Sequence, residues 1–188
     1  MFSGSTCVSV YITQNKYYCA NIGDSRAIIA QHQDKNQWVA VPLSIDHKPD
    51  SAIEYQRIIQ SGGRVDCFKD QEGNCVGPSR VWMKYENIPG LAMSRSFGDF
   101  VASQVGVIQE PEILSFDIKE QDRILVVASD GIWEFLSNQM VINMVQPFYQ
   151  KNDTEGACEK LIKEAVSAWK REDDVIDDIT CIVAFLNK

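Results

Sequence analysis

An uninterrupted apolar run from Ile124 to Ala128 constrains the fold of this chain more than any other stretch. A run of this length predicts a strand that is buried on both faces. The run ends at Ser129 and Asp130, and Gly131 lets the backbone turn sharply. A carboxylate at the tip of a buried strand is costly to desolvate unless a cation lies beside it. Because acids outnumber bases in this stretch, we expect a metal ion to supply that charge.

The first part of the chain has the pattern of short strands joined by tight turns. Gln14-Asn15-Lys16 and Gly23-Asp24-Ser25 are turn signals between apolar stretches. Strands this closely spaced favour an antiparallel meander, because parallel strands need a longer crossover connection. We therefore expect strands over residues 6–13, 17–22, 26–31 and 37–42.

The hydrophobic period then changes to that of a helix. Ser51 and Glu54 have the spacing of a capping box, in which each side chain bonds the backbone N–H of the other residue. Gly62-Gly63 predicts the end of this helix. Its apolar side is expected to carry Ile53, Ile58 and Tyr55.

The rest of the chain alternates strands with two amphipathic helices. Strands are expected over residues 64–68, 80–84, 112–118, 122–129 and 179–186, with a long loop over 87–107. Ser137 is a plausible cap for the first of the two helices. These patterns predict one α+β domain over residues 1–188. The apolar stripes of the two helices are Met140, Val141, Met144, Val145 and Phe148, and then Ala157, Leu161, Ile162, Ala165, Val166 and Trp169.

Charge and cysteine usage narrow the function. A net charge of -8 and a pI near 4.8 argue against nonspecific binding to nucleic acid or to an anionic membrane. The 6 cysteines are scattered without a Cys-x-x-Cys pair, and Cys7, Cys19 and Cys181 lie in apolar runs where they predict small buried hydrophobic residues. No signal peptide pattern precedes them, so we expect reduced thiols in a cytoplasmic or nuclear compartment.

Acidic residues stand at the ends of several expected elements. Asp24 lies in a turn, Asp130 ends the buried strand, Glu134 follows four positions later, and Asp177-Asp178 precedes the last strand. Carboxylates from different strand ends suit hard divalent cations such as Mg²⁺ or Mn²⁺. Taken singly, Asp24 and Asp177 could equally be turn formers or caps. The two histidines are too dispersed to suggest a zinc site.

Several short motifs resemble, in order along the chain, those of the metal-dependent protein serine/threonine phosphatases of type 2C, the PPM family. The order of the motifs matters more than any single one. They are Ser3-Gly4-Ser5-Thr6, Ala20-Asn21-Ile22-Gly23-Asp24-Ser25-Arg26, Asp46-His47-Lys48-Pro49, Ser61-Gly62-Gly63, Pro89-Gly90-Leu91-Ala92-Met93-Ser94-Arg95-Ser96-Phe97-Gly98-Asp99, Glu110-Pro111-Glu112, Ala128-Ser129-Asp130-Gly131-Ile132-Trp133-Glu134 and Asp177-Asp178-Ile179-Thr180.

The resemblance implies an antiparallel β-sandwich flanked by helices that hydrolyses phosphoserine and phosphothreonine in phosphoprotein substrates. It implies two or three Mg²⁺ or Mn²⁺ ions and a metal-bridging water as nucleophile, with no side-chain nucleophile. By position, Asp130 and Asp177 match direct metal ligands, and Asp24 and Glu134 match acids associated with a third ion. His47 matches a structural turn position, and residues 77–103 resemble the flap that tunes substrate choice.

One hallmark of that family has no counterpart in these residues. Relatives carry Asp-Gly-His-Gly and an earlier Arg upstream of the segment that matches Ser3-Gly4-Ser5-Thr6, whereas the only Asp-Gly here is Asp130-Gly131. We therefore expect an incomplete catalytic domain with weak or no activity of its own, whose exposed sheet edges could pair two copies. The alternative is a naturally short pseudophosphatase that acts as a binding or regulatory module.

Overall fold

The computed structural model describes residues 2–34, 37–173 and 175–186. The chain divides into two compact units, each assembled from separated segments. The first unit comprises residues 1–7, 21–24 and 46–112, and the second comprises residues 8–20, 25–45 and 113–188.

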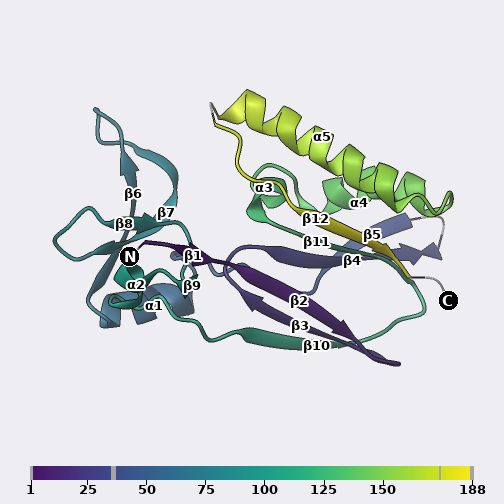
Figure 1. The fold of residues 1–188 in the computed structure, drawn as a ribbon, viewed down its shortest axis with the longest axis horizontal. Coiled ribbons are helices and arrows are strands. Elements are labelled where there is room, and N and C mark those ends of the chain that lie inside the picture. Colours follow the sequence, from purple (N-terminus) through teal and green to yellow (C-terminus); the bar gives the residue numbers. More distant parts are fainter. Residues whose placement is uncertain (1, 35–36, 174, 187–188) are drawn as a thin grey trace. The chain divides into compact units, whose positions relative to one another are not determined.

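The second unit is built on two sheets (Figure 1). One has the order β10-β3-β2, formed by β10 (Glu112–Asp117), β3 (Lys16–Ile22) and β2 (Cys7–Ile12). The other has the order β12-β11-β4-β5, formed by β12 (Cys181–Phe185), β11 (Asp122–Ala128), β4 (Arg26–Gln33) and β5 (Gln37–Pro42). Its neighbouring strands are all antiparallel, which confirms the antiparallel arrangement expected from the closely spaced strands.

Strand β11 lies between β12 and β4 and is buried on both faces, as the unbroken apolar run predicted. Because side chains alternate along a strand, its residues divide between two cores. Leu125 joins Tyr17 and Ile29 in the core of the sandwich. Ile124 and Val126 belong to the cluster on the opposite face of the sheet.

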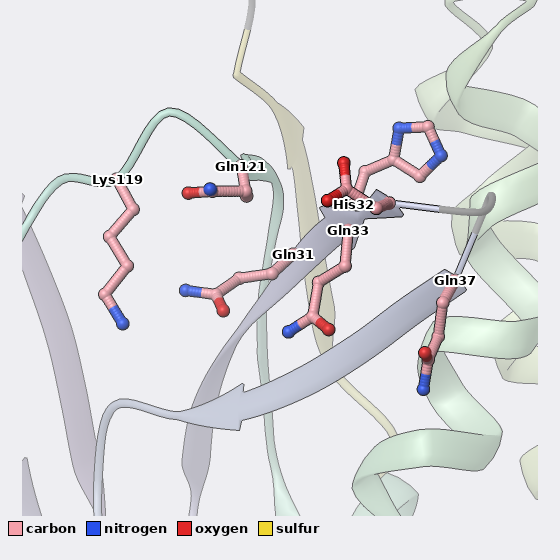
Figure 2. A pocket seen from close by; sticks show the side chains of 7 residues that line it. Gln31, His32, Gln33, Gln37, Lys119 and Gln121 are labelled. Carbon is pink, nitrogen blue, oxygen red and sulfur yellow. The ribbon is translucent and has the colours of Figure 1, made fainter.

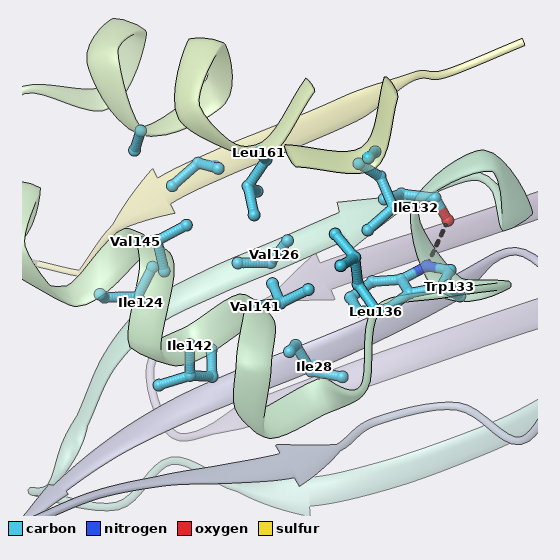
Figure 3. Packing of buried hydrophobic residues seen from close by; sticks show 14 of the residues in the cluster. Ile28, Ile124, Val126, Ile132, Trp133, Leu136, Val141, Ile142, Val145 and Leu161 are labelled. Carbon is cyan, nitrogen blue, oxygen red and sulfur yellow. Dashed lines mark hydrogen bonds between the residues drawn. The ribbon is translucent and has the colours of Figure 1, made fainter. Parts of the chain in front are cut away.

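Helices cover that opposite face (Figure 3). The short α3 (Asp130–Trp133) follows β11 directly, and α4 (Asn138–Tyr149) and α5 (Thr154–Glu172) supply Val141, Val145 and Leu161 to the cluster. The Ser137 side chain accepts a hydrogen bond from the backbone N–H of Met140, so the predicted cap is confirmed. Both amphipathic helices form where the apolar periodicity placed them.

The first unit has its own smaller core. It contains α1 (Ala52–Gln60), the antiparallel sheet β6 (Gly63–Lys69), β7 (Cys75–Met83) and β8 (Pro89–Leu91), the short α2 (Phe100–Ser103), and the pair β1 (Gly4–Ser5) and β9 (Phe97–Gly98). The prediction of one long loop over residues 87–107 is therefore wrong in part. The core of the first unit is formed by Ile58, Val81, Ala102, Val105 and Val107.

The capping box predicted at the start of α1 is also wrong. The Ser51 hydroxyl donates to the carbonyl of Lys48, and Glu54 is 4% exposed and bound to arginines. Ile58 is fully buried, but Ile53 and Tyr55 are exposed, so the apolar side of α1 is narrower than expected. The charged Glu54 side chain lies inward because Arg57 of the same helix and Arg95 neutralise it there.

Two expectations for the cysteines are corrected. Cys67 and Cys75 form a disulfide, whereas reduced thiols were expected. Cys7 is exposed and Cys181 only half-buried, so of the three thiols expected in the core Cys19 alone is fully buried. Sequence spacing did not indicate the disulfide, because only the pairing of β6 with β7 brings the two residues together. None of the helices in the described part of the chain is both long and apolar enough to span a bilayer.

Candidate metal centre

The turn that carries Asp130 is bonded to the segment that carries Asp177. At the end of β11, the backbone N–H of Ser129 donates to the carbonyl of Thr180 at 3.0 Å. The Ser129 hydroxyl donates to the carbonyl of Asp178 at 3.1 Å and accepts from the N–H of Thr180 at 3.0 Å. These bonds fix the Asp130 turn against the strand end that follows Asp177.

Gly131 makes this close approach possible. A Cβ atom at this position would lie 2.4 Å from the carbonyl oxygen of Asp178 and 3.0 Å from the side chain of Ile179. The Gly131 carbonyl in turn accepts a hydrogen bond from Nε1 of buried Trp169 in α5, at 2.7 Å. The Asp130–Gly131 turn is therefore held from two sides.

The predicted ligands of the second unit lie around this turn. Asp130 begins α3 and is half-buried, and Glu134 is exposed one helical turn later, with its N–H donating to the carbonyl of Asp130 at 2.9 Å. Asp177 is exposed, and its carboxylate accepts from the N–H of Asp178 at 2.7 Å. Among the described residues, the one group of three potential ligands within 4.8 Å of one another is Asp66, Cys67 and Cys75, so it contains none of the predicted ones.

Asp24 belongs to the first unit, where it is 1% exposed. One carboxylate oxygen accepts from Nζ of Lys48 at 2.6 Å, and the other, Oδ1, is buried without a hydrogen-bond partner. A Cβ at the preceding Gly23 would lie 2.4 Å from the Thr6 side chain. Three sequence motifs, those around Thr6, Asp24 and Lys48, thus meet at the Gly23–Asp24 turn.

His47 supports the turn before Asp24. Its Nδ1 accepts a hydrogen bond from the N–H of Gly23 at 3.1 Å, and its own backbone N–H donates to the carbonyl of Gly23 at 3.0 Å. Burial, together with the nearby charge of Arg95, lowers the pKa of His47 below its ordinary value. The neutral imidazole is therefore the form that fits, in agreement with the structural role expected for His47.

A neutral His47 predicts that the chain loses stability in weak acid. Because the pKa is lower in the folded state, the stabilisation is present above the ordinary pKa of 6.5 and is lost as the pH falls through the lowered value. Protonation would also place an N–H on Nδ1 facing the N–H of Gly23. We expect His47→Asn to weaken the fall in urea midpoint between about pH 7.5 and about pH 5.5. His32→Asn is the control, and an unchanged pH response in His47→Asn would contradict this role.

Sequence reasoning missed the buried ion network around Glu54. This carboxylate accepts from Arg57 and Arg95, each at 2.7 Å, and from the Ser94 hydroxyl at 2.6 Å. Burial raises the pKa of Glu54, but the hydrogen bonds from Arg57, Arg95 and Ser94 outweigh it and lower the pKa to about 2. Arg95 lies in one of the motifs that resemble the family. The spacing of Ser51 and Glu54, however, predicted a helix cap, so the sequence did not reveal that Glu54 pairs with Arg95.

The second unit contains a polar pocket of about 530 Å³ (Figure 2). Gln31 in its wall is 8% exposed and donates to Oδ1 of Asp122 at 3.0 Å, so this buried amide serves the fold. The pocket contains none of the predicted metal ligands. Its lining residues are Gln31, His32, Gln33, Asp34, Gln37, Lys119 and Gln121.

Comparison with known proteins connects the motifs to one family. The family model described as protein phosphatase 2C matches residues 1–174. "Probable protein phosphatase 2C 73" of Arabidopsis thaliana is 38% identical over 188 residues, covering 99% of this chain and 48% of its own length. "Probable protein phosphatase 2C 12" of Oryza sativa subsp. japonica is 38% identical, with 99% and 46% covered. The chain thus spans about half the length of these curated relatives.

Solved structures agree with this match at the level of the fold. A serine-threonine phosphatase 2C from Toxoplasma gondii superposes with a TM-score of 0.82 at 21% identity, covering 98% of this chain and 58% of that one. A second Toxoplasma gondii phosphatase gives a TM-score of 0.68 at 28% identity, with 92% and 49% covered. The helix-covered antiparallel sandwich expected from the sequence is confirmed.

Proposed function

The chain belongs to the protein phosphatase 2C family, and from this premise we propose that it forms part of a metal-dependent protein serine/threonine phosphatase. The proposed reaction is the hydrolysis of phosphoserine and phosphothreonine in phosphoprotein substrates. The observation that carries the proposal is the bonded pair of segments around Asp130 and Asp177, which holds two acids at adjoining strand ends.

The residues present fit hard divalent cations. Their donors are carboxylate oxygens, which Mg²⁺ and Mn²⁺ prefer. We propose that Asp130 and Asp177 hold the catalytic ions and that Glu134 and Asp24 are also metal ligands. The unpartnered Oδ1 of Asp24 is available to a cation, while Lys48 already balances the other oxygen.

When bound, such ions neutralise phosphoryl charge and lower the pKa of water, so the protein needs no side-chain nucleophile. The chain's own contribution is to orient its acids. Ser129 and Gly131 hold Asp130 in place, and His47 and Thr6 support the turn of Asp24. Lys48 supplies a counter-charge to the buried Asp24 carboxylate.

Manganese binding to the 188-residue chain tests the ligand assignment. We expect a calorimetric signal for the unaltered chain and a loss of affinity of about tenfold or more in Asp130→Asn and Asp177→Asn, because each substitution removes an anionic oxygen ligand. Glu172→Gln is the control, since it neutralises an exposed acid at the end of α5. Equal binding by all four proteins would refute the assignment.

Turnover separates the phosphatase from the pseudophosphatase alternative. Without Asp-Gly-His-Gly, we expect the 188-residue chain to release little or no phosphate from a phosphothreonine peptide with Mn²⁺. Joining it to the segment of an Arabidopsis relative that carries this motif is expected to give manganese-dependent turnover, which Asp177→Asn abolishes. A folded chimera that binds Mn²⁺ but remains inactive would instead favour a binding or regulatory module.

A further inference from the structure

We propose that Cys67 and Cys75 form a reversible redox modification site, in which Cys75 reacts with peroxide-type oxidants and Cys67 then closes the disulfide. The site lies on the β6–β7 hairpin of the first unit. It involves none of the acids assigned to the metal centre, so its test does not depend on phosphatase activity.

The disulfide closes the outer part of a weakened hairpin. Asp66 pairs with Arg80 and Phe68 with Val76, so one residue of β6 lies opposite three of β7 at this irregularity. Pro78 is among those three and has no backbone N–H to donate. On the turn side of this irregularity, the described pairs between β6 and β7 are Phe68 with Val76 and Lys69 with Cys75. The Cys67–Cys75 bond spans this segment with a Cα–Cα distance of 5.4 Å.

The two sulfur atoms have opposite electrostatic surroundings. Cys75 is exposed, and Nζ of Lys69 lies 3.2 Å from its Sγ, so once reduced its thiolate is favoured. Cys67 is 9% exposed, and Oδ1 of Asp66 lies 3.6 Å from its Sγ, which favours the protonated thiol.

Asp66 also positions the cation. Its carboxylate binds Nζ of Lys69 at 3.2 Å, and this contact is the main reason why the pKa of Asp66 is lowered. The ammonium is thereby held at the hairpin tip, near the sulfur of Cys75. The same carboxylate therefore keeps Cys67 protonated and keeps Lys69 beside Cys75.

This asymmetry sets the order of the reaction. The Cys75 thiolate attacks one oxygen of hydrogen peroxide, and the O–O bond breaks to give a sulfenic acid and, after protonation, water. The Cys67 sulfur then forms the S–S bond, loses its proton, and displaces hydroxide, which leaves as a second water. A thiolate of a dithiol reductant attacks exposed Cys75 and releases Cys67, and the second thiol of the reductant then releases Cys75 by closing the reductant's own disulfide.

Tryptic peptide mapping tests the site directly, because cleavage after Arg64, Lys69 and Arg80 places the two cysteines on separate peptides, 65–69 and 70–80. The chain is reduced, freed of reductant, treated with limiting hydrogen peroxide and alkylated. We expect the linked pair to disappear on reduction and to re-form with peroxide while exposed Cys7 remains alkylated. Failure to re-form the link, or oxidation of Cys7 at an equal rate, would overturn the proposal.

Substitutions test the assigned roles. In Cys67→Ser a sulfenic-acid trap is expected to label Cys75, whereas Cys75→Ser should leave Cys67 almost unlabelled; equal or reversed labelling contradicts the assignment. Adding Lys69→Gln to Cys67→Ser should slow alkylation of Cys75 at neutral pH by about 3- to 10-fold. Lys84→Gln is the matched control, because its ammonium lies over the ring of Tyr85. An equal rate of Cys75 alkylation in both variants would show that Lys69 does not activate Cys75.

Discussion

Glu54→Gln is expected to destabilise the chain by about 3 kcal/mol at neutral pH, a large part of the total stability of a domain. The substitution keeps the size of the side chain but leaves Arg57 and Arg95 without their buried counter-charge. Both guanidinium groups retain backbone carbonyl partners, at Gly106 and Glu110, which cannot neutralise them. The lowered pKa of Glu54, about 2 against an ordinary 4.5, corresponds to a similar energy.

The destabilisation caused by Glu54→Gln depends on pH. The Glu54 contribution is complete above the ordinary pKa of 4.5 and is lost as the pH falls toward 2. Urea denaturation should therefore separate the variant from the unaltered chain at neutral pH and less so near pH 3. Glu164→Gln breaks a more exposed pair with Lys160, which solvent screens, and should cost much less stability. Similar losses of stability in both variants would mean that burial does not determine how much the Glu54 network stabilises the chain.

Gly131→Ala is expected to weaken both the fold and the metal centre. The added Cβ would collide with the backbone carbonyl of Asp178, which cannot rotate away as a side chain could. We expect a loss of about 1–3 kcal/mol of stability. Because the collision separates the turn of Asp130 from the segment of Asp177, we also expect Mn²⁺ affinity to fall by about 10- to 100-fold.

Gly156→Ala provides the matched control. There the new Cβ would meet the carboxylate of Asp153 at 2.4 Å, a side chain that can turn aside. Its cost should stay below that of Gly131→Ala, and Mn²⁺ binding should be unchanged. Denaturation and calorimetry on both variants give the comparison. Unaltered Mn²⁺ affinity in Gly131→Ala would show that this contact does not position Asp130.

The sequence indicated those features that depend on neighbours along the chain. The apolar run of β11 reappears in the cores on both faces of its sheet. Most residues of the α4 and α5 stripes are buried or half-buried, but Met140 and Ile162 are exposed, so those two positions were predicted wrongly. The spacing of short strands predicted antiparallel pairing, and the ordered motifs predicted the family. Each of these signals is a hydrophobic periodicity or a short motif. It depends only on residues that are close together in the sequence, so no knowledge of the tertiary structure is needed to recognise it.

Only the tertiary structure decided the partners of side chains far apart in sequence. Ser51 and Glu54 have the spacing of a cap, but Arg95 draws Glu54 into a buried network instead. Cys67 and Cys75 become a disulfide through the pairing of β6 with β7. Gly131 matters because Asp178 approaches it from another strand end. A buried charge or a close backbone contact depends on which segments meet, and strand pairing and packing determine that.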